Sequence, residues 1–199
     1  MSVLKQYIEK SSCVFQNYLL TIDEEELWRV ANYIRESIAN GNRLHFTGIG
    51  KPAHIATYAA SLFSSVGTPA YYLHGTEAVH GSSGQLVEGD IVICISNSGE
   101  TEELKQTVRA IKNNGASVIA VTGKRESWLA GESRFCLFGA VSQEGDTLNR
   151  APRSSVLVQI HLLQCLSVIL QEAVGLTPTE YVRRHPGGAL GNLRENEVG

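Results

Sequence analysis

The feature that most constrains the fold is the segment 90–95, in which Asp90 is followed by five apolar residues, Ile-Val-Ile-Cys-Ile. These residues do not alternate with polar ones, and Gly89 and Ser96 bound the segment. The pattern is typical of a strand with both faces buried, in a parallel sheet that helices cover on each side. The segment 117–121, Ser-Val-Ile-Ala-Val, has the same character. Two such strands predict an α/β fold.

Strand and helix patterns alternate along the rest of the chain. Further strands are expected at 44–47, 70–73 and 134–138, and helices at 53–66, 102–114 and 154–173. This alternation predicts a parallel, doubly wound sheet. The first forty residues have helical periodicity, with Asp23 as the expected N-cap of a helix and Gly41 at the end of the segment.

Composition bounds the class of protein. The 199 residues are expected to form a single domain, 1–199, with an N-terminal helical arm at 1–40 and a sheet–helix core at 41–192. A formal net charge of −3 argues against a nucleic-acid partner, which requires clustered Lys and Arg. No signal-peptide pattern opens the chain, and we expect no stretch of about 18 apolar residues that could span a membrane. The four cysteines form no CxxC pair, so we expect a soluble, cytoplasmic protein with reduced thiols.

In a doubly wound sheet, ligands bind beyond the carboxyl ends of the strands. The first such loop, 47–53, is Thr-Gly-Ile-Gly-Lys-Pro-Ala and resembles a dinucleotide-binding turn. No acidic residue follows about twenty positions later, where a ribose would need one, and the spacing is not that of a Walker A loop. Backbone N–H groups near Gly50 and the ammonium of Lys51 instead predict an anion site.

A second loop, 96–101, has the sequence Ser-Asn-Ser-Gly-Glu-Thr and joins a buried strand to a helix. The hydroxyls of Ser96, Ser98 and Thr101 and several free N–H groups converge there, which is the donor set that a phosphate needs. The alternative is that Ser98 is only the N-cap of the following helix. Because three hydroxyls cluster, we favour phosphate binding.

Other polar residues follow the remaining strands. Residues 77–81 (Glu-Ala-Val-His-Gly), Glu144 and residues 151–155 (Ala-Pro-Arg-Ser-Ser) lie in two further strand-exit loops. The six histidines form no HxxxH or HExxH array, so no metal site is expected. From its chemistry alone, His185 belongs to a glycine-rich tail.

Together these segments resemble the SIS (sugar isomerase) domain, and specifically its arabinose-5-phosphate isomerase branch. The resemblance covers residues 40–192, and the segment 185–191 is the one most specific to this branch. The matching segments are Gly48-x-Gly50-Lys51, Gly67-Thr68-Pro69, His74-x-x-Glu77-Ala78-x-His80-Gly81, Ser96-Asn97-Ser98-Gly99-Glu100, Ala151-Pro152-x-Ser154-Ser155 and His185-Pro186-Gly187-Gly188-Ala189-Leu190-Gly191.

The resemblance implies a five-stranded parallel sheet sandwiched by helices (three-layer αβα, flavodoxin-like) and a homotetramer with active sites between subunits. It also implies an isomerase that interconverts an aldose phosphate and a ketose phosphate through an enediol, for which no metal or redox cofactor is chemically necessary. The implied catalytic residues are Lys51, Glu103, Glu144 and His185. The implied substrate-binding and phosphate-binding residues are Gly50, His80, Ser96, Ser98, Thr101 and Ser154. Glu144 is the preferred base, and the choice between it and Glu103 stays open.

Three positions depart from the family pattern. Pro52 and Ser82 replace residues that would supply a hydroxyl and a carboxylate, and Arg153 adds a cation. These changes surround the substrate, so they leave the identity of the sugar open. Family members often carry CBS regulatory modules after the SIS domain, and we expect none here because the sequence ends at Gly199.

Two other functions are compatible with the loop 96–101. A hexulose-phosphate or heptose-phosphate isomerase would share the fold, but the segment 185–191 disfavours both. A non-catalytic sugar-phosphate sensor would carry an N-terminal helix-turn-helix with a basic recognition helix, whereas residues 1–40 are acidic. Glu103 and Glu144, which a pure sensor does not need, favour the enzyme.

Overall fold

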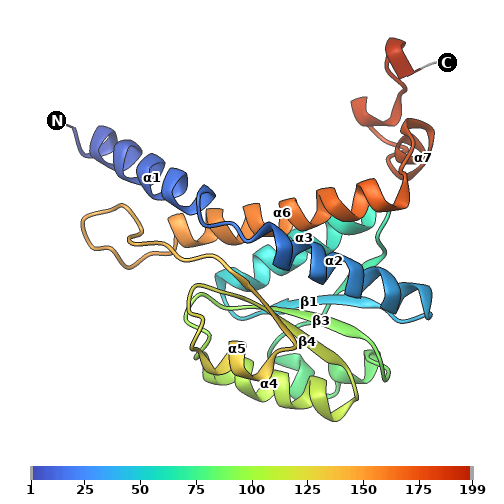
Figure 1. Cartoon of the computed structure of the whole chain (residues 1–199), viewed down its shortest axis with the longest axis horizontal. Coiled ribbons are helices and arrows are strands. Elements are labelled where there is room, and N and C mark those ends of the chain that lie inside the picture. The colour runs from blue at the N-terminus through green and yellow to red at the C-terminus, as the bar shows by residue number, and fades with distance from the viewer. Residues whose placement is uncertain (1, 198–199) are drawn as a thin grey trace.

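The computed structural model describes residues 2–197, so Met1 and Gly199, the outer bounds of the expected single domain, lie outside the described residues. A sheet of five parallel strands lies between two layers of helices (Figure 1). The strand order is β2-β1-β3-β4-β5, which confirms the predicted α/β fold. The strands are β1 (Leu44–Gly48), β2 (Ala70–Tyr72), β3 (Ile91–Ile95), β4 (Ser117–Thr122) and β5 (Phe135–Phe138).

Helices connect and flank the strands. The α-helices are α1 (Val3–Leu19), α2 (Glu24–Ala39), α3 (Lys51–Ser65), α4 (Glu102–Asn113), α5 (Trp128–Glu132), α6 (Ser154–Val174) and α7 (Pro178–Arg184). Four single turns of 3₁₀-helix are η1 (Glu77–His80), η2 (Ser82–Gln85), η3 (Ala189–Gly191) and η4 (Glu195–Glu197). The segment with helical periodicity at the N-terminus forms two helices, and Asp23 caps the second by accepting a hydrogen bond from the backbone of Glu26 at 3.0 Å.

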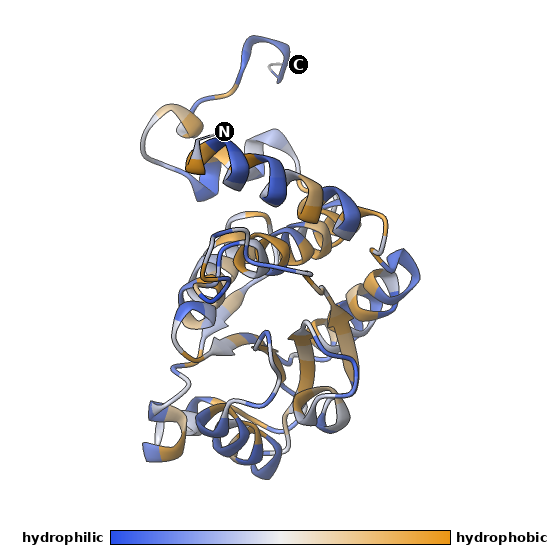
Figure 2. Ribbon diagram, turned by 90° about the vertical axis from the view of Figure 1, so that its left-hand side faces the viewer, coloured by the Kyte–Doolittle hydropathy of each residue, from blue (hydrophilic) through white to orange (hydrophobic). Residues whose placement is uncertain are grey.

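The sheet buries a separate apolar core on each face. Ile91, Ile93 and Ile95 pack beneath α2, α3 and α6, whereas Val92 and Cys94 pack against α4 on the opposite face. All five side chains are buried, which explains why this strand contains no polar residue. In Figure 2 the hydrophobic residues gather along the central strands, and the helices mix hydrophobic and hydrophilic residues.

Helix α6 corrects the expectation that no segment has the composition of a membrane span. Its 21 residues include an 18-residue window with a mean hydropathy of 1.5, which is long and apolar enough to cross a membrane. Half of that window is buried in this fold, where Val158, Leu162 and Leu166 join the core beneath α2 and α3. Packing within the domain therefore accounts for part of its apolar character.

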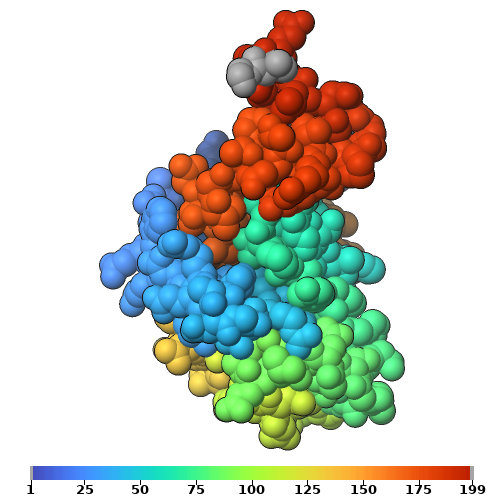
Figure 3. All heavy atoms as spheres, turned by 90° about the vertical axis from the view of Figure 1, so that its right-hand side faces the viewer, coloured from blue at the N-terminus to red at the C-terminus, as the bar shows by residue number. Residues whose placement is uncertain are grey.

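The chain enters every strand at one edge of the sheet and leaves it at the opposite edge. Because all strands are parallel, the loops that follow them lie at one edge, which we call the carboxyl edge. Helix α6 begins there and ends at the opposite, amino edge, so α7 lies at the amino edge (Figure 1). Arg184 covers Gly67, where an added Cβ would lie 3.0 Å from its guanidinium nitrogen. Figure 3 shows α7 and residues 185–197 projecting from one end of the molecule.

Candidate functional site

The strand order creates a topological switch point between β1 and β3. These strands are neighbours, yet the helices that follow them, α3 and α4, cover opposite faces of the sheet. Such a switch point is where open α/β sheets bind their ligands. The loop 48–51 and the loop Ser96–Thr101, here called the serine loop, flank it from either side.

The glycine turn after β1 is tightly packed on one side and open on the other. A Cβ on Gly48 would lie 2.8 Å from Pro52, and a Cβ on Gly75 would lie 2.8 Å from the carbonyl oxygen of Gly48. Gly50 has φ 66° and ψ −129° at the start of α3, and a Cβ there would meet no atom within 4 Å. Lys51 is exposed as the first residue of α3. Proline is well tolerated in a first helical turn, so the helix accommodates Pro52.

The serine loop brings its three hydroxyls into one turn. Ser96 is 4% exposed, and its hydroxyl accepts a hydrogen bond from the backbone of Gly99 at 3.1 Å and lies 3.3 Å from the Thr101 hydroxyl. The Ser98 hydroxyl accepts a bond from the backbone of Glu100 at 3.2 Å. The N-cap of α4 is Thr101, whose side chain makes no capping bond. The alternative of Ser98 as the N-cap is therefore wrong.

The loop between β4 and α5, residues 123–127, also contacts the serine loop, and the sequence analysis did not single it out. Its Gly123 donates a backbone hydrogen bond to the carbonyl of Asn97 at 3.0 Å, and Leu129 in α5 donates one to the carbonyl of Gly99 at 3.1 Å. The only sequence signal was the Ser127 N-cap before a short helix, which by itself gives no reason to expect a contact with another loop.

Glu103 and His80 lie on elements beside the serine loop. Glu103 is exposed in the first turn of α4, and its carboxylate makes no hydrogen bond or ion pair within residues 2–197. His80 is exposed at the end of η1, which packs on α4 through the buried side chain of Ala78. The Thr107 hydroxyl on α4 also donates to the carbonyl of Gly75.

Glu144 is bound to the start of α6. Its side chain is only 8% exposed, and Oε2 accepts backbone hydrogen bonds from Arg153 at 2.6 Å and Ser155 at 3.1 Å. The neighbouring Ser154, 3% exposed, has a hydroxyl without a partner, as does Ser155. The unusual cation Arg153 forms an ion pair with Asp146 of the same loop. The sequence predicted a strand-exit loop for Glu144 but did not predict that it caps α6.

Lys51 lies next to the start of α6. A cavity of about 260 Å³ separates the first turns of α3 and α6, and its lining includes Lys51, His54, Tyr58, Pro152 and Val156. The carboxyl edge thus holds Gly50 and Lys51, the serine loop with Glu103, His80, and the loop that carries Glu144 and Ser154.

His185 is the predicted site residue that does not join this group. It ends α7 at the amino edge, where its ring stacks on Tyr181 with centroids 4.0 Å apart. Its Nδ1 lies 2.8 Å from the carbonyl oxygen of Tyr181, which can only accept a hydrogen bond. Nδ1 therefore carries the proton in the neutral ring, and Nε2 is left as the acceptor.

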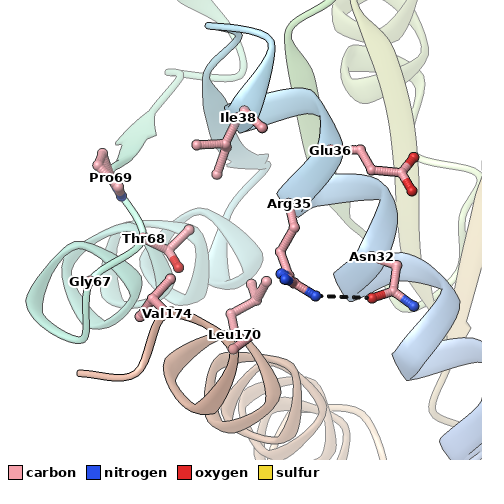
Figure 4. Close-up of a pocket in the computed structure, with 11 residues that line it drawn as sticks. Asn32, Arg35, Glu36, Ile38, Gly67, Thr68, Pro69, Leu170 and Val174 are labelled. Atoms are coloured by element: carbon pink, nitrogen blue, oxygen red, sulfur yellow. Dashed lines mark hydrogen bonds between the residues drawn. The ribbon is translucent and has the colours of Figure 1, made fainter.

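A different cavity, of about 510 Å³, contains none of the predicted site residues. It opens at the amino edge between α2, the residues before β2 and the end of α6 (Figure 4). The guanidinium of Arg35 points toward Leu170 and donates to Asn32 at 3.4 Å. Within residues 2–197, no three His, Cys, Asp or Glu side chains come together as a metal-binding group.

A comparison with known protein families identifies the family of this chain. The model of the SIS domain matches residues 37–169. The chain belongs to the SIS domain family. The family predicted from the sequence is therefore confirmed, and its fold accounts for the serine loop at the switch point.

Curated relatives extend the likeness beyond the family model. The chain is 39% identical to arabinose 5-phosphate isomerase KdsD of Pseudomonas aeruginosa, over 77% of this chain and 47% of that protein. It is 34% identical to the protein of the same name from Escherichia coli, over 90% of this chain and 58% of that one. The chain thus spans about half the length of the curated relatives it matches.

Solved structures give a fuller overlap. An Escherichia coli CFT073 protein in complex with arabinose 5-phosphate has a TM-score of 0.81 and 32% identity, over 92% of this chain and 95% of that one. A Bacteroides fragilis protein described as a candidate phosphosugar isomerase involved in capsule formation has a TM-score of 0.83 and 33% identity, over 93% and 96% of the two chains. Both solved chains are therefore close to this chain in length.

Proposed function

We propose that this SIS-domain protein is an isomerase that interconverts an aldose phosphate and a ketose phosphate, with arabinose 5-phosphate as its first candidate substrate. The observation that carries the proposal is the serine loop at the switch point, opposite Gly50 and Lys51. A chain of the same fold and 32% identity has been solved with arabinose 5-phosphate bound, and the curated relatives are named for this reaction.

The proposed phosphate site consists of neutral donors. The hydroxyls of Ser96, Ser98 and Thr101 lie in one turn before α4, whose first N–H groups have no helical partner and whose dipole adds partial positive charge. The ammonium of Lys51 and the N–H groups after Gly50 lie across the switch point, where they would polarise a sugar oxygen. The cavity beside Lys51 and Pro152 offers space for the sugar. Ser154 lies between Pro152 and Val156, which both line this cavity.

The reaction moves a proton between adjacent carbons, so one carboxylate must act as base. Glu144 remains our preferred base because Oε2 accepts both backbone hydrogen bonds at α6 and no protein group donates to Oε1 in the described structure. Glu103, exposed and unpaired in residues 2–197, is the alternative. His80, beside the serine loop, would assist ring opening.

His185 enters this scheme only from another subunit, because it lies at the amino edge of its own chain. Apolar side chains that are exposed on α1 and α6 suit burial against further copies, and they include Val3, Leu4, Ile8, Leu157 and Val168. The proposal therefore includes a homotetramer of single SIS domains, in the cytoplasm and without a nucleic-acid or membrane partner, in which His185 completes a neighbouring site.

An isomerisation screen tests the function. The purified protein is incubated with arabinose 5-phosphate, other pentose and hexose phosphates, and heptose phosphates, and each product is identified by ¹H NMR. In ²H₂O we expect conversion of an aldose phosphate to its ketose, with ²H incorporated at C1, the carbon that receives a proton as C2 becomes the carbonyl carbon. Tight binding of sugar phosphates without any conversion would overturn the enzyme and indicate the sensor function.

A further inference from the structure

Residues outside the serine loop hold its backbone in place. The carbonyl of Asn97 accepts hydrogen bonds from the backbone of Gly123 at 3.0 Å and from the Thr122 hydroxyl at 3.4 Å. The carbonyl of Gly99 accepts one from the backbone of Leu129 at 3.1 Å. All of these donors lie between the end of β4 and the start of α5, so this segment fixes where the carbonyl groups of the serine loop point.

Glu100 forms the most polar of these links. Its Oε1 accepts a hydrogen bond from the backbone N–H of Trp128 at 2.7 Å, and its Oε2 pairs with Lys105 at 3.0 Å. The cations of Lys105 and Arg109 lie 5.7 Å and 5.6 Å from the centre of the Trp128 ring. Both carboxylate oxygens thus have partners within the protein.

The two segments also touch closely at Gly99. This residue has φ 65°, and an added Cβ would lie 2.2 Å from the Ser127 hydroxyl oxygen. Ser127 is itself fixed as the N-cap of α5, where its side chain accepts from the backbone of Ala130. The backbone N–H of Gly99, which donates to the Ser96 hydroxyl, therefore belongs to the residue at which the two segments meet.

We propose that Glu100 and the backbone N–H of Trp128 form a brace that positions the phosphate donors of the serine loop, so that Glu100 is a positioning residue and not a catalytic acid. The inference rests on the proposed function, because it assigns the substrate phosphate to this loop. A braced loop binds phosphate without first being ordered, and this removes an entropic cost from binding. When the brace is absent, that cost appears as weaker binding of every phosphorylated ligand.

The first experiment compares three single variants: Glu100→Ala, Glu100→Gln and Glu102→Ala. Glu102 is the matched control because its carboxylate lies 3.8 Å from the same Lys105 ammonium, whereas the backbone N–H of Trp128 donates to Glu100. Affinities for inorganic phosphate and arabinose 5-phosphate are measured by calorimetry. We expect Glu100→Ala to weaken both about five- to tenfold, the effect of one lost hydrogen bond. Glu100→Gln keeps an oxygen that accepts from Trp128, so it should restore most of the affinity, and Glu102→Ala should match the wild type.

The second experiment removes the N–H of Trp128 while leaving the helix intact. Trp128 is the first residue of α5, where proline is tolerated, and Ser127 before it has φ −77° and ψ 158°, which proline accepts in the preceding residue. Trp128→Pro therefore deletes the donor to Glu100, and Trp128→Ala is its control because it also loses the indole but keeps the N–H. We expect phosphate affinity to be about five- to tenfold lower for the proline variant than for the alanine variant.

Activity measurements separate positioning from general damage. For Glu100→Ala, KM should rise as the phosphate affinity falls, with kcat within about threefold of the wild type, because the substitution leaves the proposed base in place. Equal phosphate affinities for the proline and alanine variants, or for Glu100→Ala and Glu102→Ala, would overturn the brace, as would a wild type that binds no phosphate. A wild type that binds phosphate but isomerises no sugar contradicts the proposed function, and the binding comparison then still decides the brace.

Discussion

Oε2 of Glu144 lies 2.6 Å from the backbone nitrogen of Arg153, and this contact ties the preferred base to the start of α6. The same oxygen accepts from Ser155 at 3.1 Å, so the carboxylate satisfies two of the N–H groups that a helix start leaves unpaired. A negative charge at this position is also stabilised by the helix dipole. Glu144 therefore has a structural role in addition to the chemical one that we propose.

Substitutions of Glu144 separate these two roles. Glu144→Gln keeps an oxygen that accepts both hydrogen bonds, so the free energy of unfolding should fall by less than about 1 kcal/mol, whereas Glu144→Ala should lose about 1–2 kcal/mol, as for a deleted cap. If Glu144 abstracts the proton, turnover of Glu144→Gln should fall by about two to four orders of magnitude. Urea titration and steady-state kinetics measure the two effects. Retained turnover with weaker binding would transfer the role of base to Glu103.

Gly99 should be intolerant of any side chain. Its φ of 65° disfavours other residues, and the Ser127 side chain occupies the place of a Cβ. We expect Gly99→Ala to lower the free energy of unfolding by more than about 2 kcal/mol. Adding Ser127→Gly should recover part of that loss, because it removes the overlapping atoms but leaves the backbone strain. A double variant no more stable than Gly99→Ala would show that the overlap is not the cause.

The positions of the strands could be predicted because a strand buried on both faces consists of consecutive apolar residues. Ile91 to Ile95 contains no polar residue since one core lies on each side, and the helix-strand alternation then determines the parallel sheet. The short helix α7 was not predicted, since its seven residues are too few for a periodic pattern. Its capping box at Thr177 and Glu180 was the local signal that could have indicated it.

The residues at the site could be predicted only where the chemical groups that act together lie close to one another in the sequence. Three hydroxyls within six residues indicate the serine loop by themselves, whereas the partners of Glu144 and Glu100 lie 9 and 28 residues away. Such distant backbone donors have no side-chain signature, because any residue except proline supplies an N–H. The capping role of Glu144 and the brace at Trp128 therefore required the structure.

A buried histidine at the amino edge should make stability depend on pH. His45 is 1% exposed, with Nε2 3.2 Å from Asp90 and Nδ1 3.2 Å from the Gln85 amide nitrogen. The amide donates to Nδ1, so the neutral ring carries its proton on Nε2 and donates to Asp90. Burial lowers the pKa of His45, and the nearby Asp90 carboxylate offsets this only in part. The folded state thus favours the neutral ring.

The sign of the effect follows from proton binding. Below the ordinary histidine pKa of about 6.5, the unfolded chain binds a proton that the folded chain still resists, so stability falls as pH decreases. We expect a lower free energy of unfolding at pH 5.5 than at pH 7.5, and His45→Gln should reduce the difference. Burial also lowers the pKa of His161, so part of the slope should persist in that variant. The same slope in wild type and His45→Gln would contradict the assignment.

Asp90 does not contribute in this range. Burial acts to raise its pKa, but backbone hydrogen bonds from Val87 and Arg43 and the charges of Arg43 and His45 outweigh burial, so the pKa is lowered. Its stabilising contribution is present above the ordinary aspartate pKa and is lost only in more acidic solution. An additional loss of stability below about pH 4 would report this carboxylate.

The location of His185 predicts complementation between inactive subunits. His185 lies at the amino edge while Lys51 lies at the carboxyl edge, so one chain does not bring them together. We expect His185→Ala and Lys51→Ala each to be nearly inactive alone. In a mixed oligomer, a Lys51 from one variant and a His185 from the other complete some of the sites. If subunits mix at random, about a quarter of the sites contain both residues and turnover should recover to about that fraction.

The two variants are co-expressed with different affinity tags, and oligomers that carry both tags are purified in succession. Each variant co-expressed with itself under both tags is the control, and it should remain inactive. Tyr181→Ala provides a milder test, because it removes the ring that stacks on His185 at 4.0 Å but keeps the backbone carbonyl that accepts from Nδ1. Its turnover should fall less than that of His185→Ala. Mixed oligomers as inactive as the controls would mean that His185 does not act across subunits, and its place at the amino edge would then exclude it from the reaction.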